Sequence, residues 1–189
     1  MDQDLVVSAQ GGDQQAFQEL TVAHHRRLYR VAHGILRDVH LAEDATQVAF
    51  LEIWRNLPTL QDPARFNGWS YRILVHACYA EAKRRSDWAQ VDDIGPTAMP
   101  AAPDQLGMVI ERDRLDRGFR RLSVEHRTVI VLRCLLDLPM DEVAAVLGIP
   151  TGTVGSRLSR ALEAMRAALQ AESRTGVPIG EFTQQEVAR

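Results

Sequence analysis

The chain is poor in lysine, cysteine and aromatic residues, and it has no long apolar run. Its 189 residues include one lysine, Lys83, and two cysteines, and only 6% of them are aromatic. No apolar stretch approaches the roughly 20 residues that a membrane helix needs. The first residues have neither the basic nor the apolar region of a signal peptide. We therefore expect a cytoplasmic protein with no direct membrane insertion.

The cysteines and histidines give no sign of a reactive or metal-binding site. Cys78 and Cys134 are far apart, and each falls within an apolar helical pattern. We interpret both as small buried hydrophobic residues rather than as a disulfide or metal pair. His24 and His25 point to different sides of a helix, and neither has a carboxylate at metal-ligand spacing. The sequence thus predicts no metal, no cofactor, no small-molecule substrate and no enzymatic activity.

The charge balance limits how the chain can meet nucleic acid. Its 22 basic and 25 acidic residues give a formal net charge of -3. A protein of this charge does not coat nucleic acid by bulk attraction, so any DNA contact must come from local basic patches. Almost all of the positive charge is arginine, which suits bidentate contacts to phosphate and guanine.

Three N-terminal segments carry apolar residues at helical spacing. The first runs from 13 to 37, as one helix or two in succession, with Asp13 as its N-cap. The second runs from about 41 to 57 and is ended by Pro58. The third runs from about 66 to 85. We assign these helices to one domain with the bounds 1–86.

The composition changes after this domain. Prolines and acidic residues replace the helical period in 87–106, which we interpret as a flexible linker. Helical periodicity resumes in a second domain, 107–171, where Ser123 is placed as an N-cap. The last residues, 172–189, are expected to form a frayed tail. No strand signal is evident, so the predicted fold class is all-α, with two small helical domains joined by a flexible linker.

The most informative stretch, 140–169, predicts a helix-turn-helix in the C-terminal domain. Ala144 is small enough to let two helices approach, and Gly148 permits a left-handed turn residue between them. The free side of the second helix carries hydroxyls and arginines but no acid, which suits a DNA groove. The alternative is an ordinary helical hairpin with solvated arginines. The candidate DNA-binding residues here are Thr151, Thr153, Ser156, Arg157 and Arg160.

A second basic face lies on the third predicted helix. Cationic and aromatic side chains fall at helical spacing along it, which fits phosphate contact combined with base stacking. Cations at a helix C-terminus also complement the helix dipole, so Arg84 and Arg85 have a purely structural alternative. Trp69 shares an apolar stripe with Ile73 and is expected in the core. The members of this face are Arg72, His76, Tyr79, Lys83, Arg84 and Arg85.

Three motifs in a fixed order give the chain a family resemblance. They are EDATQVAFLEIW (43–54), RFNGWSYRI (65–73) and a long C-terminal motif that begins LSVEHRTVIV (122–131). Together they resemble the short sigma-70-type factors of the extracytoplasmic function (ECF) group, over about 13–169. The resemblance implies a factor that binds core RNA polymerase and promoter DNA. Its first domain would open the minus-ten element, and its second would bind the minus-thirty-five element.

The resemblance also implies roles for individual residues. It places a polymerase-docking surface on Asp44, Gln47, Phe50 and Trp54, although the two aromatic side chains have the alternative of being simply core. It places Arg65 with the minus-ten face, in a loop that would border a pocket for a flipped base. An anti-sigma factor is a further candidate partner. The acidic linker would thread through polymerase channels, or it would be a solvated tether.

Four departures from the family pattern stand out. Val48 replaces a common glutamate in the docking motif, and His76 replaces a common asparagine on the minus-ten helix. Pro139 replaces a serine N-cap, and Gly155 stands where a lysine is usual.

The alternative function is that of a conventional helix-turn-helix transcription regulator that works without polymerase. Its N-terminal domain would then serve for sensing or dimerisation.

Overall fold

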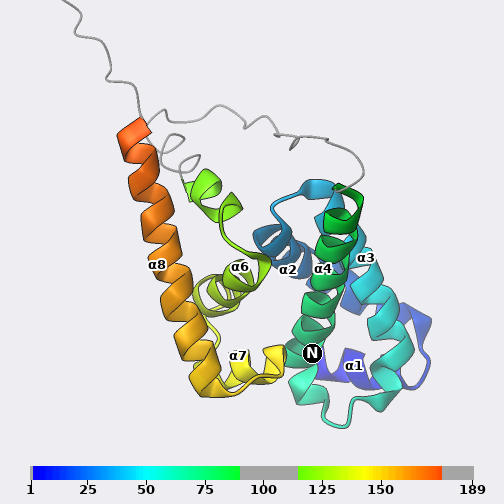
Figure 1. Ribbon diagram of the computed structural model, residues 1–189. Helices are drawn as coiled ribbons and strands as arrows, with labels where there is room; N and C mark the ends of the chain where they lie inside the picture. Colours follow the sequence, from blue (N-terminus) through cyan, green and yellow to red (C-terminus); the bar gives the residue numbers. More distant parts are fainter. Residues whose placement is uncertain (1, 90–114, 176–189) are drawn as a thin grey trace, which may run out of the picture.

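The computed structural model describes residues 2–89 and 115–175, and every regular element within these ranges is helical (Figure 1). This confirms the predicted all-α fold of two helical domains. None of the described helices is both long and apolar enough to cross a bilayer. The elements are α1 (Asp2–Gln10), α2 (Gln14–Leu36), α3 (Val39–Asn56), η1 (Leu57–Thr59), η2 (Pro63–Arg65), α4 (Phe66–Ala89), α6 (Val124–Ile130), η3 (Val131–Leu135), α7 (Met140–Leu147) and α8 (Thr151–Thr175).

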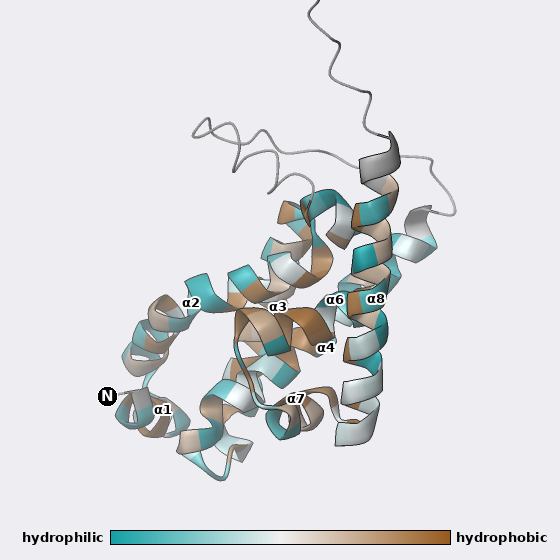
Figure 2. Ribbon diagram, turned by 90° about the vertical axis from the view of Figure 1, so that its left-hand side faces the viewer, coloured by the Kyte–Doolittle hydropathy of each residue, from teal (hydrophilic) through white to brown (hydrophobic). Residues whose placement is uncertain are grey.

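The N-terminal domain is built on α2, α3 and α4, which pack against one another. The segment predicted as one helix or two is the single helix α2, and the Asp13 carboxylate caps it by accepting from the backbone N–H groups of Gln15 and Ala16. Alanines line the inner side of α3 and bring its backbone close to its neighbours; Ala42, Ala45 and Ala49 are fully buried. The hydrophobic face of these helices turns inward, as Figure 2 shows for the bundle.

Two helical features of this domain were not predicted. The first is α1, which buries Val6 and Ala9 and ties itself to the end of α3, where the Gln10 side-chain amide donates to the carbonyls of Leu57 and Leu60. The second is the length of α4, which runs to Ala89, beyond the predicted linker start. Neither proline nor glycine occurs between Gly68 and Gly95, so nothing ends the helix at 86.

The C-terminal domain contains the predicted helix-turn-helix. Ser123 caps α6 through a bond from the His126 N–H, as expected. Between α7 and α8, Gly148 adopts the left-handed conformation with φ 65°. Val143 of α7 and Val154 of α8 are fully buried and join the two helices. Pro139 precedes α7 without any side-chain cap, so the departure noted in the sequence leaves that helix start uncapped.

The interpretation of the cysteines was right for one residue and wrong for the other. Cys78 is buried in the N-terminal domain, and burial raises the pKa of its thiol to about 12. Cys134 is exposed. The reason is local: η3 is a π-helical turn in which the Leu136 N–H reaches back to the Val131 carbonyl. The wider turn moves residues 134 and 135 off the apolar stripe of a regular α-helix.

Candidate nucleic-acid and polymerase interfaces

Helix α8 presents its predicted DNA-binding side to the outside. Val154 and Ala161 are fully buried and fix the orientation of the helix, which leaves the opposite side free. Thr151, Ser156 and Arg160 are exposed, and Thr153 and Arg157 are half-buried. The Arg160 guanidinium donates to the Ser156 carbonyl at 3.2 Å, a bond that stays on its own helix. The structure thus gathers these five residues on the first three turns of one helix.

Gly155 lies within this surface and has room for a side chain. A Cβ at this position would meet only the Met140 Cε, at 3.7 Å, which is an ordinary contact. We expect Gly155→Lys to tighten promoter binding, because it adds about 1 kcal/mol of helix propensity and one phosphate contact. Binding should also become more salt-dependent, with a log–log slope steeper by about one. Titrations at several salt concentrations measure both effects.

The matched control for this change is Gly155→Ala. It supplies the gain in helix propensity without the charge, so it should stabilise the domain and leave the salt slope unchanged. If lysine and alanine gave the same affinity and the same slope, this side of α8 would not face DNA.

On α4, the predicted minus-ten residues are not equivalent. Arg72, His76 and Lys83 are exposed, and among the described residues neither Arg72 nor Lys83 forms an ion pair. Arg84 pairs with Glu81 at 2.5 Å and lies 3.7 Å from Asp44, and Arg85 pairs with Asp38 at 2.6 Å. These two arginines therefore tie α4 to α3 and its N-cap. Because α4 continues to Ala89 and has no basic residue in its last turn, the helix-dipole alternative from the sequence does not apply to them.

Tyr79 differs from its neighbours on α4 because it is half-buried. Its hydroxyl lies buried without a well-formed hydrogen bond. Burial raises the pKa of the Tyr79 hydroxyl, and the C-terminal domain's Thr128 and Arg157 lie close enough to act on that pKa in the opposite direction. A residue expected to face DNA is thus covered by the other domain.

The loop before α4 borders a cavity, at the place where the resemblance implies a pocket for a flipped base. The cavity has a volume of about 690 Å³. Arg65, Trp69 and Arg72 line one side of it, and Asp141 and Glu142 of α7 line the other. Trp69 is half-buried, and its ring centroid lies 6.1 Å from that of Phe66. One side of the Trp69 ring therefore packs on the core, and the side chain also lines the cavity.

Helix α3 carries the predicted polymerase-docking residues. Asp44 and Gln47 are exposed, whereas Phe50 and Trp54 are half-buried. The Trp54 ring lies 4.7 Å from that of Phe17, and Phe50 stacks on His25 at 6.1 Å, so both aromatic side chains support the packing of α3 on α2. The structure keeps the polar pair on the surface and places the aromatic pair beneath it.

Sequence reasoning missed one member of this surface. Leu51 is 57% exposed, and Val48 beside it is 40% exposed. Both lie off the alanine stripe that faces the core, and Leu51 is four residues after Gln47, one helical turn away. The signal was present: a leucine outside the apolar stripe of an amphipathic helix has no packing role and marks an exposed apolar site.

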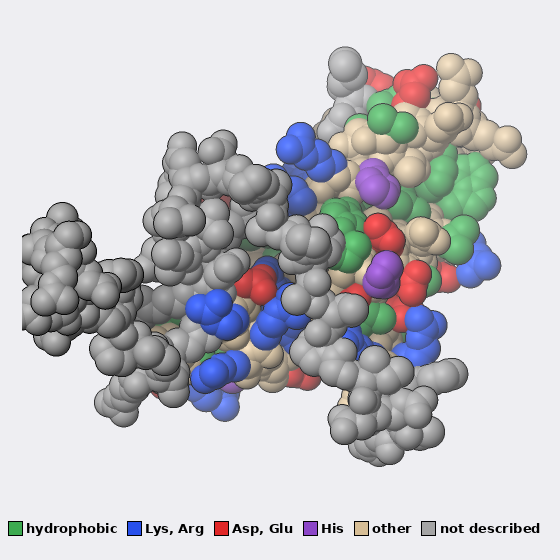
Figure 3. Space-filling view, turned by 90° about the horizontal axis from the view of Figure 1, so that it is seen from above, with side chains coloured by type: hydrophobic (Ala, Val, Ile, Leu, Met, Phe, Trp, Pro, Cys, Tyr) green, Lys and Arg blue, Asp and Glu red, His purple; other side chains and the backbone are tan. Residues whose placement is uncertain are grey.

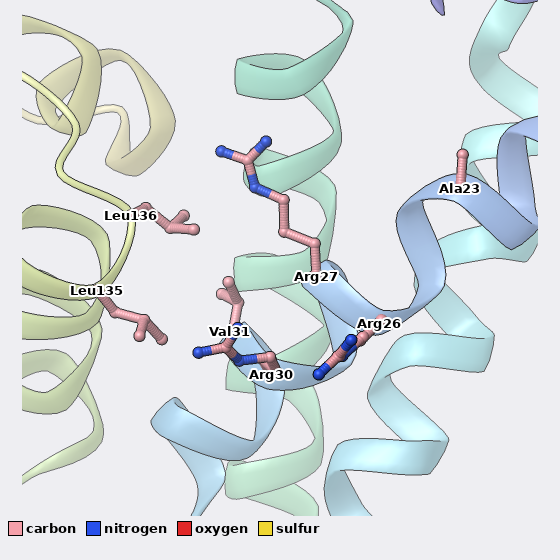
Figure 4. Close-up of a pocket in the computed structure, with 7 residues that line it drawn as sticks. All are labelled: Ala23, Arg26, Arg27, Arg30, Val31, Leu135 and Leu136. Carbon is pink, nitrogen blue, oxygen red and sulfur yellow. The ribbon is translucent and has the colours of Figure 1, made fainter.

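Charges of both signs are intermingled on the described part of the face that Figure 3 shows. Figure 3 shows, from above, acidic side chains set among the arginines rather than one continuous basic face. This agrees with the net charge of -3 and restricts DNA contacts to local sites. One such local group lines a groove of about 460 Å³, where Arg26, Arg27 and Arg30 of α2 lie across from Leu135 and Leu136 (Figure 4).

Both domains match known protein families. Residues 20–88 match the family model for sigma-70 region 2, and residues 112–165 match that for sigma-70 region 4. The ECF RNA polymerase sigma factor SigM of Mycobacterium tuberculosis is 32% identical, with 94% of this chain and 89% of that protein covered. The ECF RNA polymerase sigma-E factor of Escherichia coli is 34% identical, with 87% of this chain and 92% of that protein covered.

Solved structures show the same fold. The sigma factor RpoE of Bartonella quintana, solved with the anti-sigma factor NepR, has a TM-score of 0.68 at 22% identity and covers 82% of this chain and 98% of its own. CnrH, solved with the cytosolic domain of CnrY, has a TM-score of 0.62 at 26% identity and covers 93% of this chain and 99% of its own. The chain belongs to the ECF group of sigma-70-type RNA polymerase sigma factors.

Proposed function

We propose that the chain acts as a non-catalytic specificity factor of bacterial RNA polymerase in the cytoplasm. It binds the core enzyme and selects promoters through minus-ten and minus-thirty-five elements. The observation that carries this proposal is the pair of separate helical surfaces on a chain that belongs to the ECF group: α3 is suited to a protein partner, and α8 to duplex DNA. The first functional unit is the domain that ends with α4 at Ala89, three residues beyond the boundary expected from the sequence, and the second is the domain expected over 107–171.

The polymerase contact is assigned to the exposed side of α3. Asp44 and Gln47 supply polar groups there, and Leu51 supplies an exposed apolar anchor of the kind that often dominates an interface. Phe50 and Trp54 act mainly by holding α3 against α2, because each packs on a neighbouring ring.

The minus-ten contact is assigned to α4 and the loop before it. Arg72 and Lys83 neutralise phosphates, and the exposed His76 is placed to meet bases. Tyr79 can meet a base only where the C-terminal domain no longer covers it. The cavity beside Arg65 and Trp69 is large enough to receive a base turned out of the duplex. Arg84 and Arg85, which are engaged by acids, contribute mainly to positioning α4.

The minus-thirty-five contact is assigned to the exposed side of α8. The helix enters the major groove with its N-terminal turns, where Thr151 and Thr153 approach the backbone and Arg157 and Arg160 approach phosphates or guanines. We also propose an inhibitory protein partner, an anti-sigma factor. The similar chain CnrH was solved bound to part of another protein, which supports a partner of this general kind.

The proposal is tested by transcription in vitro. The purified chain is added to bacterial core polymerase on a library of promoter templates, and RNA 5′ ends are sequenced. A specificity factor yields RNA from a defined subset of templates, with shared sequence near minus ten and minus thirty-five. Binding to duplex DNA that is equally tight without polymerase, and no new start sites with it, would favour the rival, a polymerase-independent regulator.

A further inference from the structure

Three arginines on one side of α2 form a row that acidic residues do not neutralise. Arg26, Arg27 and Arg30 are all exposed, and among the described residues none of them forms an ion pair. Figure 4 shows this arginine row on one wall of its groove, with Leu135 and Leu136 across from it. No acidic residue of the described chain lines the groove. The groove therefore holds three positive charges without a counter-charge.

The acidic residues nearest in sequence to the two walls do not change this balance. Glu19, the one acid of α2, precedes Arg26 by seven residues, about 10 Å along the helix, and accepts a hydrogen bond from Gln15. Asp137, just after the leucines across the groove, pairs with Arg133. The chain thus concentrates positive charge at the arginine row despite its formal net charge of -3.

The fold does not require most of this charge. Arg26 and Arg30 are four residues apart and Arg27 and Arg30 three apart, so like charges lie on adjacent turns and destabilise the helix. Arg27 has a packing role, because its guanidinium carbon lies 5.3 Å from the centre of the buried Tyr71 ring of α4. Among the described residues, Arg26 and Arg30 have no such partner. Their charge is therefore available to a ligand.

The arginine row lies beside the helix that is assigned to the minus-ten element. Helix α2 packs against α4, and the contact of Arg27 with Tyr71 joins the row to that helix. The residue after Tyr71 is Arg72, which is exposed and assigned to DNA phosphates. The row therefore belongs to the same domain as the minus-ten surface and borders its helix.

The chemistry of the arginine row suits the phosphates of a polyanion. Each guanidinium presents a planar fork of donors that matches the oxygens of a phosphate. The three side chains follow one another along about one helical turn, so they can meet successive phosphates of one strand. Promoter DNA is the polyanion that the proposed function brings to this domain.

We propose that the arginine row is a third DNA-binding surface, which contacts phosphates of promoter DNA next to the segment that α4 binds. The inference rests on the proposed function and adds a contact outside α4, the loop before it and α8. Because the row meets phosphates and not base edges, it supplies affinity to promoters of any sequence and no base preference of its own.

Removal of two charges from the arginine row tests the proposal. The full chain is prepared as Arg26→Gln/Arg30→Gln, and Arg27 is kept because it stacks on Tyr71. Promoter binding by the holoenzyme is titrated at several salt concentrations. We expect the affinity to fall about tenfold on promoters of different sequence, and the log–log salt slope to become smaller by about two, because two phosphate contacts are lost. Unchanged affinity and slope would overturn the proposal.

The matched control removes the same charge from another part of the chain. Arg121 and Arg166 are exposed arginines of the C-terminal domain, outside the N-terminal turns of α8. Arg121→Gln/Arg166→Gln should leave the affinity within about twofold and the salt slope unchanged. An equal loss in both variants would reflect net charge and would overturn the proposal. So would weaker binding of the Arg26→Gln/Arg30→Gln chain to core polymerase without DNA, since the row would then contact protein.

Thermal unfolding separates a DNA contact from a structural role. The Arg26→Gln/Arg30→Gln chain should unfold at the same or a higher temperature than the unmodified chain, because the substitutions relieve repulsion between like charges on α2. A variant that unfolded at a clearly lower temperature would assign the arginine row to the fold and overturn the proposal.

Neutral groups in the DNA locate the contact. Methylphosphonates replace single phosphates around both promoter elements, and holoenzyme binding is measured with each template. Substitutions beside the minus-ten element that weaken binding of the unmodified chain should have no further effect on the Arg26→Gln/Arg30→Gln chain, whereas those at minus thirty-five should weaken both equally. Additive losses at every position would overturn the proposal. An unmodified chain that bound no promoter with core polymerase would instead be a failure of the proposed function.

Discussion

Replacing Arg157 and Arg160 together with alanine is expected to lower promoter-directed transcription by about 30-fold or more. Each arginine that contacts a base edge or phosphate contributes on the order of 1–3 kcal/mol. The fold should survive, because α8 is held by the buried residues Val154 and Ala161 rather than by either arginine. Multi-round transcription, with promoter binding by the holoenzyme at two salt concentrations, measures the effect.

The matched control is Arg166→Ala. Arg166 is an exposed arginine on the same helix, beyond Arg160 and away from the N-terminal turns. It should change transcription by less than about twofold, because a contact outside the groove is worth little. If Arg166→Ala were as harmful as Arg160→Ala, the effect would reflect net charge and not the placement of α8 in the groove.

Replacing Leu51 with aspartate is expected to weaken binding to core polymerase by about 30-fold, the loss typical of a residue at the centre of an interface. Leu51 is 57% exposed, so the change removes no core packing and should leave the free energy of unfolding nearly unchanged. Fluorescence anisotropy of the labelled chain, titrated with core enzyme, gives the affinity.

Val22→Asp provides the control for Leu51→Asp. Val22 is an apolar residue that is 74% exposed on α2, so the substitution makes the same chemical change outside the proposed docking surface. It should leave the affinity for core polymerase within about twofold of the unmodified chain. A Leu51→Asp chain that bound as well as the Val22→Asp chain would move the docking surface away from this side of α3.

The parts of the fold that the sequence predicts well are those with strong local signals. Asp13 and Ser123 cap their helices because their side chains can accept backbone N–H bonds. Pro58 follows the end of α3, and Gly148 adopts the left-handed turn of the helix-turn-helix. At each of these positions a single residue type restricts the backbone, so no tertiary information is needed.

Other features depend on contacts that sequence patterns do not contain. Helix α1 is short, and it is held by burial of Val6 and by the bonds of Gln10 to the distant Leu57 and Leu60 carbonyls. The exposure of Cys134 follows from a π-helical turn, which the regular spacing of apolar residues did not predict. Both require knowledge of which segments meet in space.

The candidate site likewise contains residues whose position the sequence predicts and residues whose position depends on contacts between distant segments. Periodicity placed Arg72, His76 and Lys83 on one exposed side of α4, where the structure has them. Periodicity could not predict that Tyr79, on the same side, is covered by the C-terminal domain, because a contact between domains does not change the spacing of residues within a helix. Leu51 could have been found, since the helical stripe of α3 leaves it outside the core.

We propose that two surfaces of this chain meet two separated segments of the same promoter. Iron chelates attached at His76→Cys and Ser156→Cys, in a Cys134→Ser background, cut DNA near each position. With core polymerase bound at a promoter, cleavage from position 76 should centre near minus ten and cleavage from position 156 near minus thirty-five, about 25 base pairs apart. Cleavage of one common segment from both positions, or an unchanged pattern when polymerase is left out, would contradict it.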